Sequence, residues 1–248
     1  MLRKCFFLIC ILLILSFSLG ETVNALIVDN GSNGNPCDGV AGGNGGNGGA
    51  YYLGVVTINS IGNYEVIVGD SSIGSIGANH AGATGAAGAI SGHGGNGGGG
   101  ISSDISGTLL WYSQSGSGGG LGATNEGWNT WGGYISASNV NGMGGSGGRY
   151  WYDTDYNEDH YFPGGGGYSG DASYPNRGTG GGGGGGDPGW GGGDGGAGGT
   201  GIVIIAYPTG RIYASGGTIT VIGANTIHTF TSSGTFTVTS IGNMSAFF

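Results

Sequence analysis

The sequence predicts an all-β or irregular fold in which packed glycine-rich segments alternate with short β-strands. Glycine accounts for 67 of the 248 residues, so much of the chain lacks side chains. The apolar runs between the glycine tracts are short and rich in β-branched residues, as strands are. No helical periodicity is found outside the N-terminal leader. Together these observations favour a bundle of glycine-rich chain flanked by antiparallel strands and a C-terminal β-hairpin.

The glycine-rich tract at residues 178–201 leads directly into the apolar run Ile202–Tyr207. Ordering each glycine costs about 0.5–1 kcal/mol more than ordering alanine, so a packed tract needs compensating contacts. Extended left-handed chains with three residues per turn make no internal hydrogen bonds, and their backbone groups are free to bond neighbouring chains. We therefore predict a polyglycine-II-like bundle that ends in a buried strand. Disorder of the tracts is the alternative, since glycine and proline follow no strict period over the whole chain.

The N-terminus has the pattern of a secretory signal peptide, which would form a helix. Arg3 and Lys4 precede an apolar stretch at residues 5–19, and small residues follow. Cleavage fits after Gly20 or after Ala25, and we favour Ala25, which makes the signal peptide residues 1–25. An uncleaved anchor is the alternative, although the stretch is shorter than the roughly 20 residues that span a bilayer. The mature protein is expected to be secreted, extracellular or on the cell surface, without membrane contact.

The charge of the chain argues against two kinds of partner. The net charge is −9, and after the leader the only basic residues other than histidine are Arg149, Arg177 and Arg211. Nucleic acids and anionic membranes are bound through Lys and Arg, so we expect neither as a partner. After removal of the leader Cys37 is the sole cysteine, which leaves an intermolecular disulfide, a free thiol or a residue without function.

The remaining elements follow in chain order. A strand at 26–28 enters the first glycine field. Strands at 51–59 and 64–68 flank turn-forming residues and are predicted to pair as a hairpin. A second glycine field covers 69–100, and three aromatic insertions interrupt the glycine runs within 101–177. Beyond Tyr207, alternating polar and apolar residues predict half-buried strands. We expect one domain, with a glycine-rich scaffold at 26–210 that the C-terminal strand and hairpin segment, 211–248, completes.

Four stretches carry a resemblance to a known family: Leu26-Ile-Val, residues 62–69, residues 198–208 and residues 226–238. With them the chain resembles the glycine-rich domain family of phage tail-fibre and tail-tip adhesins and microbial surface proteins. The resemblance implies a polyglycine-II scaffold that displays aromatic loops for cell-surface recognition and carries no catalytic residues. A signal peptide is foreign to a phage tail component and points instead to a cellular or envelope protein.

The order of the segments differs from that in the family. A segment like 226–238 usually precedes the first apolar strand in relatives, whereas here it comes last. We therefore expect strand 26–28 to lack a preceding partner, and unpaired strand edges recruit other chains. The C-terminal hairpin is predicted either to fold back onto strand 26–28 within the chain, which we favour, or to be donated to the next molecule as a route to self-assembly.

The aromatic insertions supply the candidate ligand-binding residues. Flat rings among Gly, Asn, Thr and Asp suit sugar faces and other surface partners. Capping of the core is the alternative role for the same rings. The candidates are Trp111, Tyr112, Trp128, Trp131, Tyr150, Trp151, Tyr152, Tyr156 and Tyr161.

A weak calcium motif lies in the third insertion. Oxygen-bearing side chains alternate there, as in loops that wrap a hard cation. The motif lacks the glycine and the bidentate acid of an EF-hand loop, and a solvated acidic loop is the alternative. The four residues are Asp153, Asp155, Asn157 and Asp159. No other cofactor is expected.

No pattern indicates an enzyme. No glycine loop precedes a helix, the histidines stand apart, and no nucleophile elbow is present. We expect a secreted, non-enzymatic, adhesin-like surface or envelope protein that binds a cell-surface glycan or protein receptor. The alternative is a structural protein that assembles into a sheath or filament, and a more remote one is ice binding through small residues such as those at 81–89.

Overall fold

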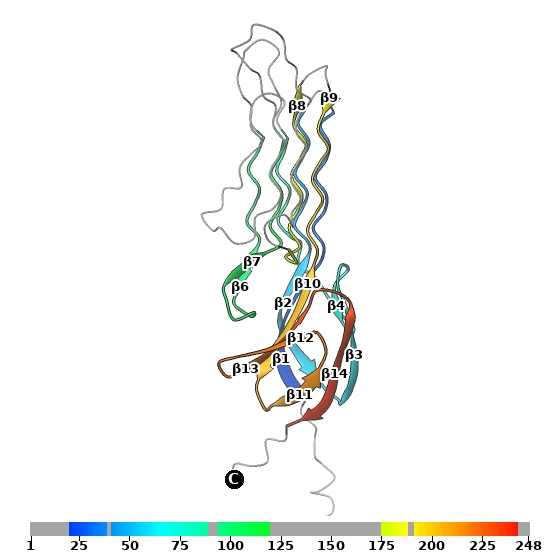
Figure 1. The fold of residues 1–248 in the computed structure, drawn as a ribbon, viewed down its shortest axis with the longest axis vertical. Coiled ribbons are helices and arrows are strands. Elements are labelled where there is room, and N and C mark those ends of the chain that lie inside the picture. Colours follow the sequence, from blue (N-terminus) through cyan, green and yellow to red (C-terminus); the bar gives the residue numbers. More distant parts are fainter. Residues whose placement is uncertain (1–19, 39–40, 89–93, 120–174, 188–190, 243–248) are drawn as a thin grey trace, which may run out of the picture.

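The structure is a computed structural model of the 248-residue chain, and it describes residues 20–38, 41–88, 94–119, 175–187 and 191–242 (Figure 1). Within these ranges the structure contains the strands β1 to β14 and no helix. Consistently, none of the described residues belongs to a helix long and apolar enough to cross a membrane. A two-sheet sandwich forms one end of the molecule, and a bundle of extended glycine-rich segments rises from it.

The first sheet holds the two apolar runs that the sequence singles out. Its five antiparallel strands lie in the order β12-β13-β10-β1-β2. They are β12 (Thr218–Ile222), β13 (Asn225–Phe230), β10 (Ile202–Pro208), β1 (Glu21–Val28) and β2 (Tyr51–Ile58). We call this sheet A.

The second sheet, sheet B, also has five antiparallel strands, in the order β11-β14-β3-β4-β5. They are β11 (Ile212–Ser215), β14 (Gly234–Ile241), β3 (Gly62–Ile67), β4 (Ser72–Ile73) and β5 (Ile76–Gly77). Two small hairpins complete the described elements. One pairs β6 (Ile101–Ser103) with β7 (Leu110–Tyr112), and the other pairs β8 (Gly186–Asp187) with β9 (Gly191–Gly192).

The core lies on both faces of sheet A. One face packs on sheet B through residues such as Ile27, Ile205 and Phe236. The other face, with Leu26 and Ile204, is covered by the β6–β7 hairpin. Strands β1 and β10 are thus apolar on both sides, which explains their unbroken apolar runs. The prediction that residues 202–207 form a buried strand is confirmed, since all six are buried.

Three predictions about strand pairing are wrong. Strands β2 and β3 do not form a hairpin, because the turn after Ile58 carries the chain from sheet A to sheet B, where β3 pairs with β14 and β4. Residues 26–28 do not lack a partner, because they belong to β1, which lies between β2 and β10. The C-terminal segment folds within the chain, but β13 and β14 form no hairpin with each other, and neither pairs with residues 26–28. Strand β13 pairs with β10 and β12 in sheet A, whereas β14 pairs with β11 and β3 in sheet B.

The described residues begin at Gly20, and β1 begins at Glu21. Residues 1–19 of the expected signal peptide lie outside the described residues. Ala25 is fully buried in the middle of β1 and pairs with Gly54 and Ile205. Cleavage after Ala25, the favoured position, would remove five residues of a central strand. Cleavage after Gly20, the other position considered, would leave the strand whole.

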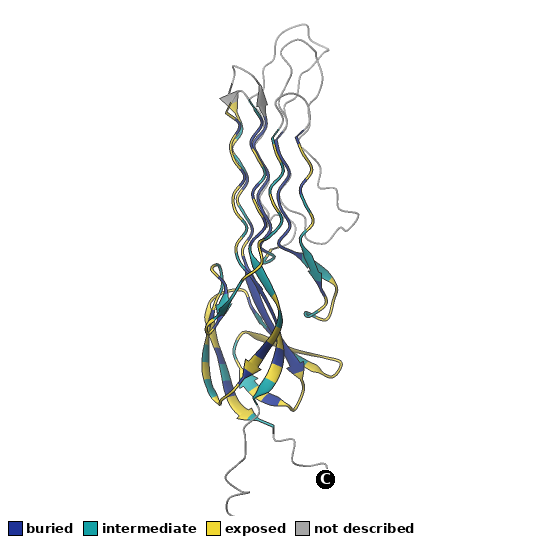
Figure 2. Cartoon of the chain, turned by 180° about the vertical axis from the view of Figure 1, so that it is seen from behind, coloured by how far each residue is buried: buried dark blue, intermediate teal, exposed yellow. Residues whose placement is uncertain are grey.

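Seven extended segments of the described chain run side by side in the bundle. They are residues 29–38, 41–50, 81–88, 94–100, 113–119, 177–185 and 192–201. Backbone hydrogen bonds of 2.6 to 3.3 Å join them laterally. Segment 177–185 lies at the centre, bonded to 29–38, 41–50, 113–119 and 192–201, and its residues 178–185 are all buried. Figure 2 shows buried residues along the length of the bundle.

The lateral hydrogen bonds recur every three residues. Those between the first and last segments run from the N–H groups of Gly31, Gly34 and Cys37 to the carbonyls of Gly199, Gly196 and Gly193. Those from the second segment to the central one run from Gly43, Gly46 and Gly49 to Gly184, Gly181 and Gly178. The repeat of three means that every third residue of a segment faces the same neighbour.

Close packing requires glycine at the facing positions. A Cβ atom on Gly181 would overlap the carbonyl oxygen of Gly196, and one on Gly180 would overlap that of Gly46. Asparagine occupies outward positions, where its side-chain oxygen accepts a hydrogen bond from the next segment. The side-chain oxygens of Asn30, Asn33, Asn44 and Asn47 accept from the N–H groups of Gly201, Gly198, Gly88 and Gly85, respectively, at 2.7 to 2.9 Å.

The sandwich core contains one buried imidazole. His228 is fully buried, with Nδ1 2.7 Å from the Gly216 carbonyl oxygen and Nε2 2.8 Å from the Tyr207 hydroxyl. Because a carbonyl only accepts, Nδ1 carries the proton and Nε2 accepts from Tyr207. Burial lowers the pKa of His228 below its ordinary value, although the bond to Gly216 opposes the shift. The folded protein therefore favours the neutral ring.

A glycine substitution tests the packing of the bundle. We expect Gly181→Ala to lower stability by about 1–3 kcal/mol or more, because the methyl group meets backbone that cannot rotate away. Gly99→Ala is the matched control, since the nearest atom to its added Cβ is on Trp111, 3.9 Å away. Thermal unfolding should show a Tm lower by about 5 °C or more for Gly181→Ala alone. Equal Tm values for the two variants would contradict close packing.

The pH dependence of stability tests the buried histidine. Below a pH of about 6.5 the unfolded chain binds a proton on His228 that the folded chain resists. Stability should therefore be fully present above that pH and fall as the pH drops below it. His228→Gln should flatten this part of the Tm–pH curve, while His80→Gln, at an exposed position against Tyr51, should leave it unchanged. An unchanged slope in His228→Gln would refute this origin of the acid sensitivity.

Candidate functional site

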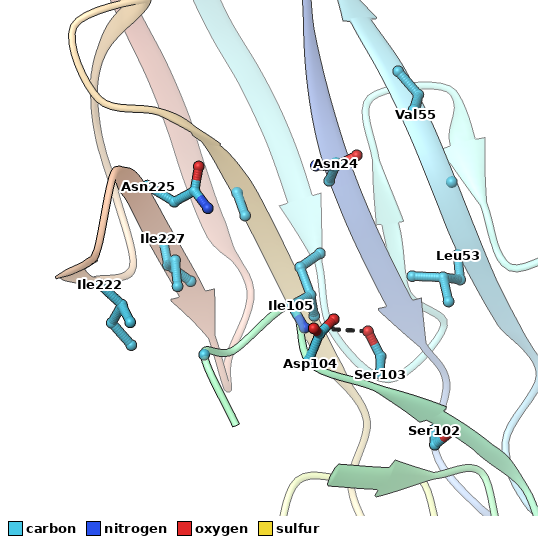
Figure 3. Close-up of a pocket in the computed structure, with 13 residues that line it drawn as sticks. Asn24, Leu53, Val55, Ser102, Ser103, Asp104, Ile105, Ile222, Asn225 and Ile227 are labelled. Carbon is cyan, nitrogen blue, oxygen red and sulfur yellow. Dashed lines mark hydrogen bonds between the residues drawn. The ribbon is translucent and has the colours of Figure 1, made fainter. Parts of the chain in front are cut away.

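A pocket of about 600 Å³ lies between the outer face of sheet A and the loop that joins β6 to β7 (Figure 3). Strands β1, β2, β10, β12 and β13 supply its floor and the loop supplies one wall. The lining residues are Asn24, Leu53, Gly54, Val55, Ser102, Ser103, Asp104, Ile105, Gly107, Ala206, Ile222, Asn225 and Ile227.

Local hydrogen bonds shape the wall of this pocket. The Ser103 hydroxyl accepts from the Ile105 N–H at 3.3 Å, and the Gly107 N–H donates to the Asp104 carbonyl at 2.7 Å. Gly107 has φ of +86°, a conformation that favours glycine, and its Cα lies against the Ile222 side chain. The loop thus turns tightly and closes the pocket against the end of β12.

The pocket offers hydrogen-bonding groups above an apolar floor. Asn24 and Asn225 contribute amides, and Asp104 contributes an exposed carboxylate. Asp104 is the only lining residue with an acidic or basic side chain. Such a site suits a neutral ligand rich in hydroxyl groups better than acid–base chemistry. One carboxylate cannot replace the converging ligands of a metal centre, and no group of three or more His, Cys, Asp or Glu occurs among the described residues.

Two of the predicted aromatic site residues are described, and they differ in exposure. Tyr112 is 1% exposed and packs with Leu26 and Ile204 beneath the β6–β7 hairpin. The Arg177 guanidinium carbon lies 5.9 Å from its ring centroid. Burial raises the pKa of the Tyr112 hydroxyl, although Ser106 and Arg177 oppose the shift. Tyr112 therefore has the capping role that the sequence left open, whereas Trp111 is partly exposed.

The other candidates lie outside the described residues. These are the aromatics Trp128, Trp131, Tyr150, Trp151, Tyr152, Tyr156 and Tyr161 and the calcium candidates Asp153, Asp155, Asn157 and Asp159. Their connection, residues 120–174, joins two segments that are parallel, as the bonds from Gly180 to Gln114 and Gly183 to Ser117 show. It therefore starts at the far end of the bundle and ends at the sandwich end.

The pocket is a feature that the sequence reading missed. Asp104 to Gly107 form the sequence DISG, whose Asp, Ser and Gly are typical of turns. The floor could not have been found in this way, because Asn24, Val55 and Asn225 come from strands far apart in the sequence.

In comparisons with known proteins, no family model, no curated protein and no solved structure matches this chain.

Substitutions at adjacent positions test the assignment of the two described aromatics. Tyr112→Ala should cost about 3–5 kcal/mol of stability, because it leaves a cavity among buried residues. Trp111→Ala should cost much less, since its ring is partly exposed. Denaturant unfolding of both variants measures the difference. A small loss for Tyr112→Ala would return this residue to the list of binding candidates.

Proposed function

We propose that the protein is a secreted, non-enzymatic, adhesin-like protein of the cell surface or envelope, which binds surface glycans or protein receptors through aromatic loops on a glycine-rich scaffold. The observation that carries this proposal is the three-residue repeat of lateral hydrogen bonds in the bundle. A bundle held in this way is a rigid support, and loops on rigid supports are where binding residues concentrate.

We also propose that the bundle is of the polyglycine-II type, as expected for the family that the sequence resembles. Three features support this. The lateral bonds have a period of three, they run from one segment to several neighbours, and the facing positions are glycine. At about 3.1 Å per residue, segments of ten residues span roughly 30 Å. A spacer of this length would place the start of the connection at 120–174 well away from the sandwich.

The placement of the aromatic residues supports a recognition role. Seven of the nine aromatic candidates belong to the connection at 120–174, whose two ends are fixed by buried segments of the bundle. The net charge of −9 disfavours phosphate-rich polymers as ligands and leaves neutral or basic surfaces. Calcium, if bound at Asp153 and its neighbours, would order part of the same connection.

The alternative is a structural protein that assembles into a sheath or filament by exchanging its C-terminal segment, which was predicted to be a hairpin and contains β13 and β14. In the described residues, β13 and β14 bury Phe230, Phe236 and Val238 within their own chain. Exchange between chains would require this core to open first. The burial therefore favours the adhesin over the exchange-built filament.

Binding of the exported chain to cells and to a glycan array tests the proposal. We expect saturable binding that Trp151→Ala weakens about tenfold or more, because buried aromatic rings supply much of the energy of such contacts. Tyr213→Ala is the control, since Tyr213 is an exposed aromatic residue of the sandwich. Asp153→Asn, Asp155→Asn and a chelator test the calcium site separately.

Absence of saturable binding would remove the adhesin proposal. Equal weakening by Trp151→Ala and Tyr213→Ala would place the binding surface elsewhere than in the insertion. Binding that survives the chelator and both Asn substitutions would exclude a calcium requirement.

A further inference from the structure

One edge of sheet A is open to solvent. Strand β12 ends the sheet and pairs with β13 on one side only. All five of its residues are exposed, including Ile219 at 47%, Val221 at 63% and Ile222 at 44%. Figure 1 shows the strand on the sandwich, below the glycine-rich bundle.

The hairpin geometry determines which backbone groups face outward. Ile222 and Asn225 flank a two-residue turn in which Gly223 has φ of +60°, as the first position of a type II′ turn requires. The two residues that flank such a turn form a backbone hydrogen-bonded pair, and hydrogen-bonded pairs alternate with non-hydrogen-bonded pairs along an antiparallel ladder. Residues 218, 220 and 222 therefore bond to β13, and the N–H and C=O groups of Ile219 and Val221 point to the open edge.

This edge lacks the features that usually prevent strand pairing. Lysine, proline or a bulge normally blocks an exposed edge, and β12 has none of them. No Asp, Glu, Lys or Arg occurs after Arg211. In a chain of net charge −9, this uncharged surface is where two copies meet with the least repulsion.

We propose that two copies of the chain dimerise through β12, which pairs with itself in an antiparallel manner about a two-fold axis at Thr220. Ile219 of each copy then lies opposite Val221 of the other, and their outward backbone groups form the hydrogen-bonded pairs. Thr218 lies opposite Ile222, and the two Thr220 residues face each other in a non-hydrogen-bonded pair. The two sheets A become one continuous sheet.

The sequence of the strand suits this register. Thr-Ile-Thr-Val-Ile places a β-branched residue at every position, and such pairs stabilise antiparallel sheets. Reversal about Thr220 keeps Ile219 and Val221 on one face, so the four apolar side chains of the dimer cover one another. The same patch is used by both copies, so the interface closes at two chains and builds no filament.

The dimer leaves both bundles free, because β12 lies on the sandwich and the bundles extend away from it. It would present two recognition regions at once, which raises avidity without new contacts. The proposal itself does not depend on what the protein binds.

Sedimentation equilibrium of the exported chain tests the interface. We expect a concentration-dependent monomer–dimer equilibrium in which Val221→Lys raises the dimer Kd at least tenfold. Ile61→Lys is the matched control, because Ile61 is an equally exposed apolar residue, at 63%, in the turn that follows β2, the strand at the opposite edge of sheet A. Circular dichroism and Tm establish that both variants fold.

A cysteine pair tests the register. In a Cys37→Ser background, Thr220→Cys should form an intermolecular disulfide on oxidation, because the two Cα atoms of a non-hydrogen-bonded pair lie about 4.5 Å apart. Thr218→Cys faces Ile222 instead and should cross-link far less. This comparison does not require any variant that weakens the edge.

Several outcomes would overturn the proposal. These are a monomer at all concentrations, a dimer that Val221→Lys leaves intact, equal cross-linking of the two cysteine variants, or open filaments. Loss of the dimer in Val55→Lys but not in Val221→Lys would place the interface at the opposite edge of sheet A, on β2, and would also reject it.

Discussion

The structure depends on the close approach of backbones in the glycine-rich bundle. Because the lateral hydrogen bonds recur every three residues, one residue in three faces a given neighbour, and glycine at that position lets the two backbones approach closely. Segment 81–88 has glycine at 82, 85 and 88, the positions that face segment 41–50. Segments 41–50 and 192–201 are mostly two glycines out of three, and their third positions are largely exposed. The central run 180–185 is glycine throughout and fully buried. Segment 113–119 is an exception, because it is buried throughout and holds only three glycines, with Ser113, Gln114, Ser115 and Ser117 among its buried residues.

The sandwich and the bundle are one continuous object rather than two. The pairing of β1 with β2 ends at Val28 and Tyr51, and the next bond runs from Asp29 to Ala50 in the bundle. In the same way, the pairing of β1 with β10 continues as the bond from Gly31 to Gly199. Sheet A and three bundle segments therefore share one register. The burial of the apolar strands helps to offset the entropy cost of ordering the glycines, because the same chains continue from one region into the other.

The sequence predicted those parts of the fold that depend on local patterns. Residues 202–207 form a buried strand because β-branched residues bury well on both sides. The three C-terminal stretches are strands because they alternate. The partners of the strands could not be predicted, since residues 60–61 form a turn that serves a hairpin and a crossing between sheets equally well. The pocket residues could not be predicted either, because they come from strands whose pairing was unknown. Most of the predicted aromatic site lies outside the described residues. The hydrogen-bond partners of the buried His228, Gly216 and Tyr207, are likewise revealed by no local pattern.

The repeat of three was present in the sequence but hidden by its own variation. Glycine has no strict period over the whole chain, yet AGGNGGNGGA, GATGAAG and GGDGGAGGTG each follow one. The period also accounts for the position of Cys37 in the bundle. In the first segment Gly31 and Gly34 face the centre of the bundle, and Cys37 is the next residue in that row. It lies at the far end of the bundle, against Gly192 of β9. Its side chain is buried there. An intermolecular disulfide, one of the three roles that the sequence allows for Cys37, would therefore require the end of the bundle to open.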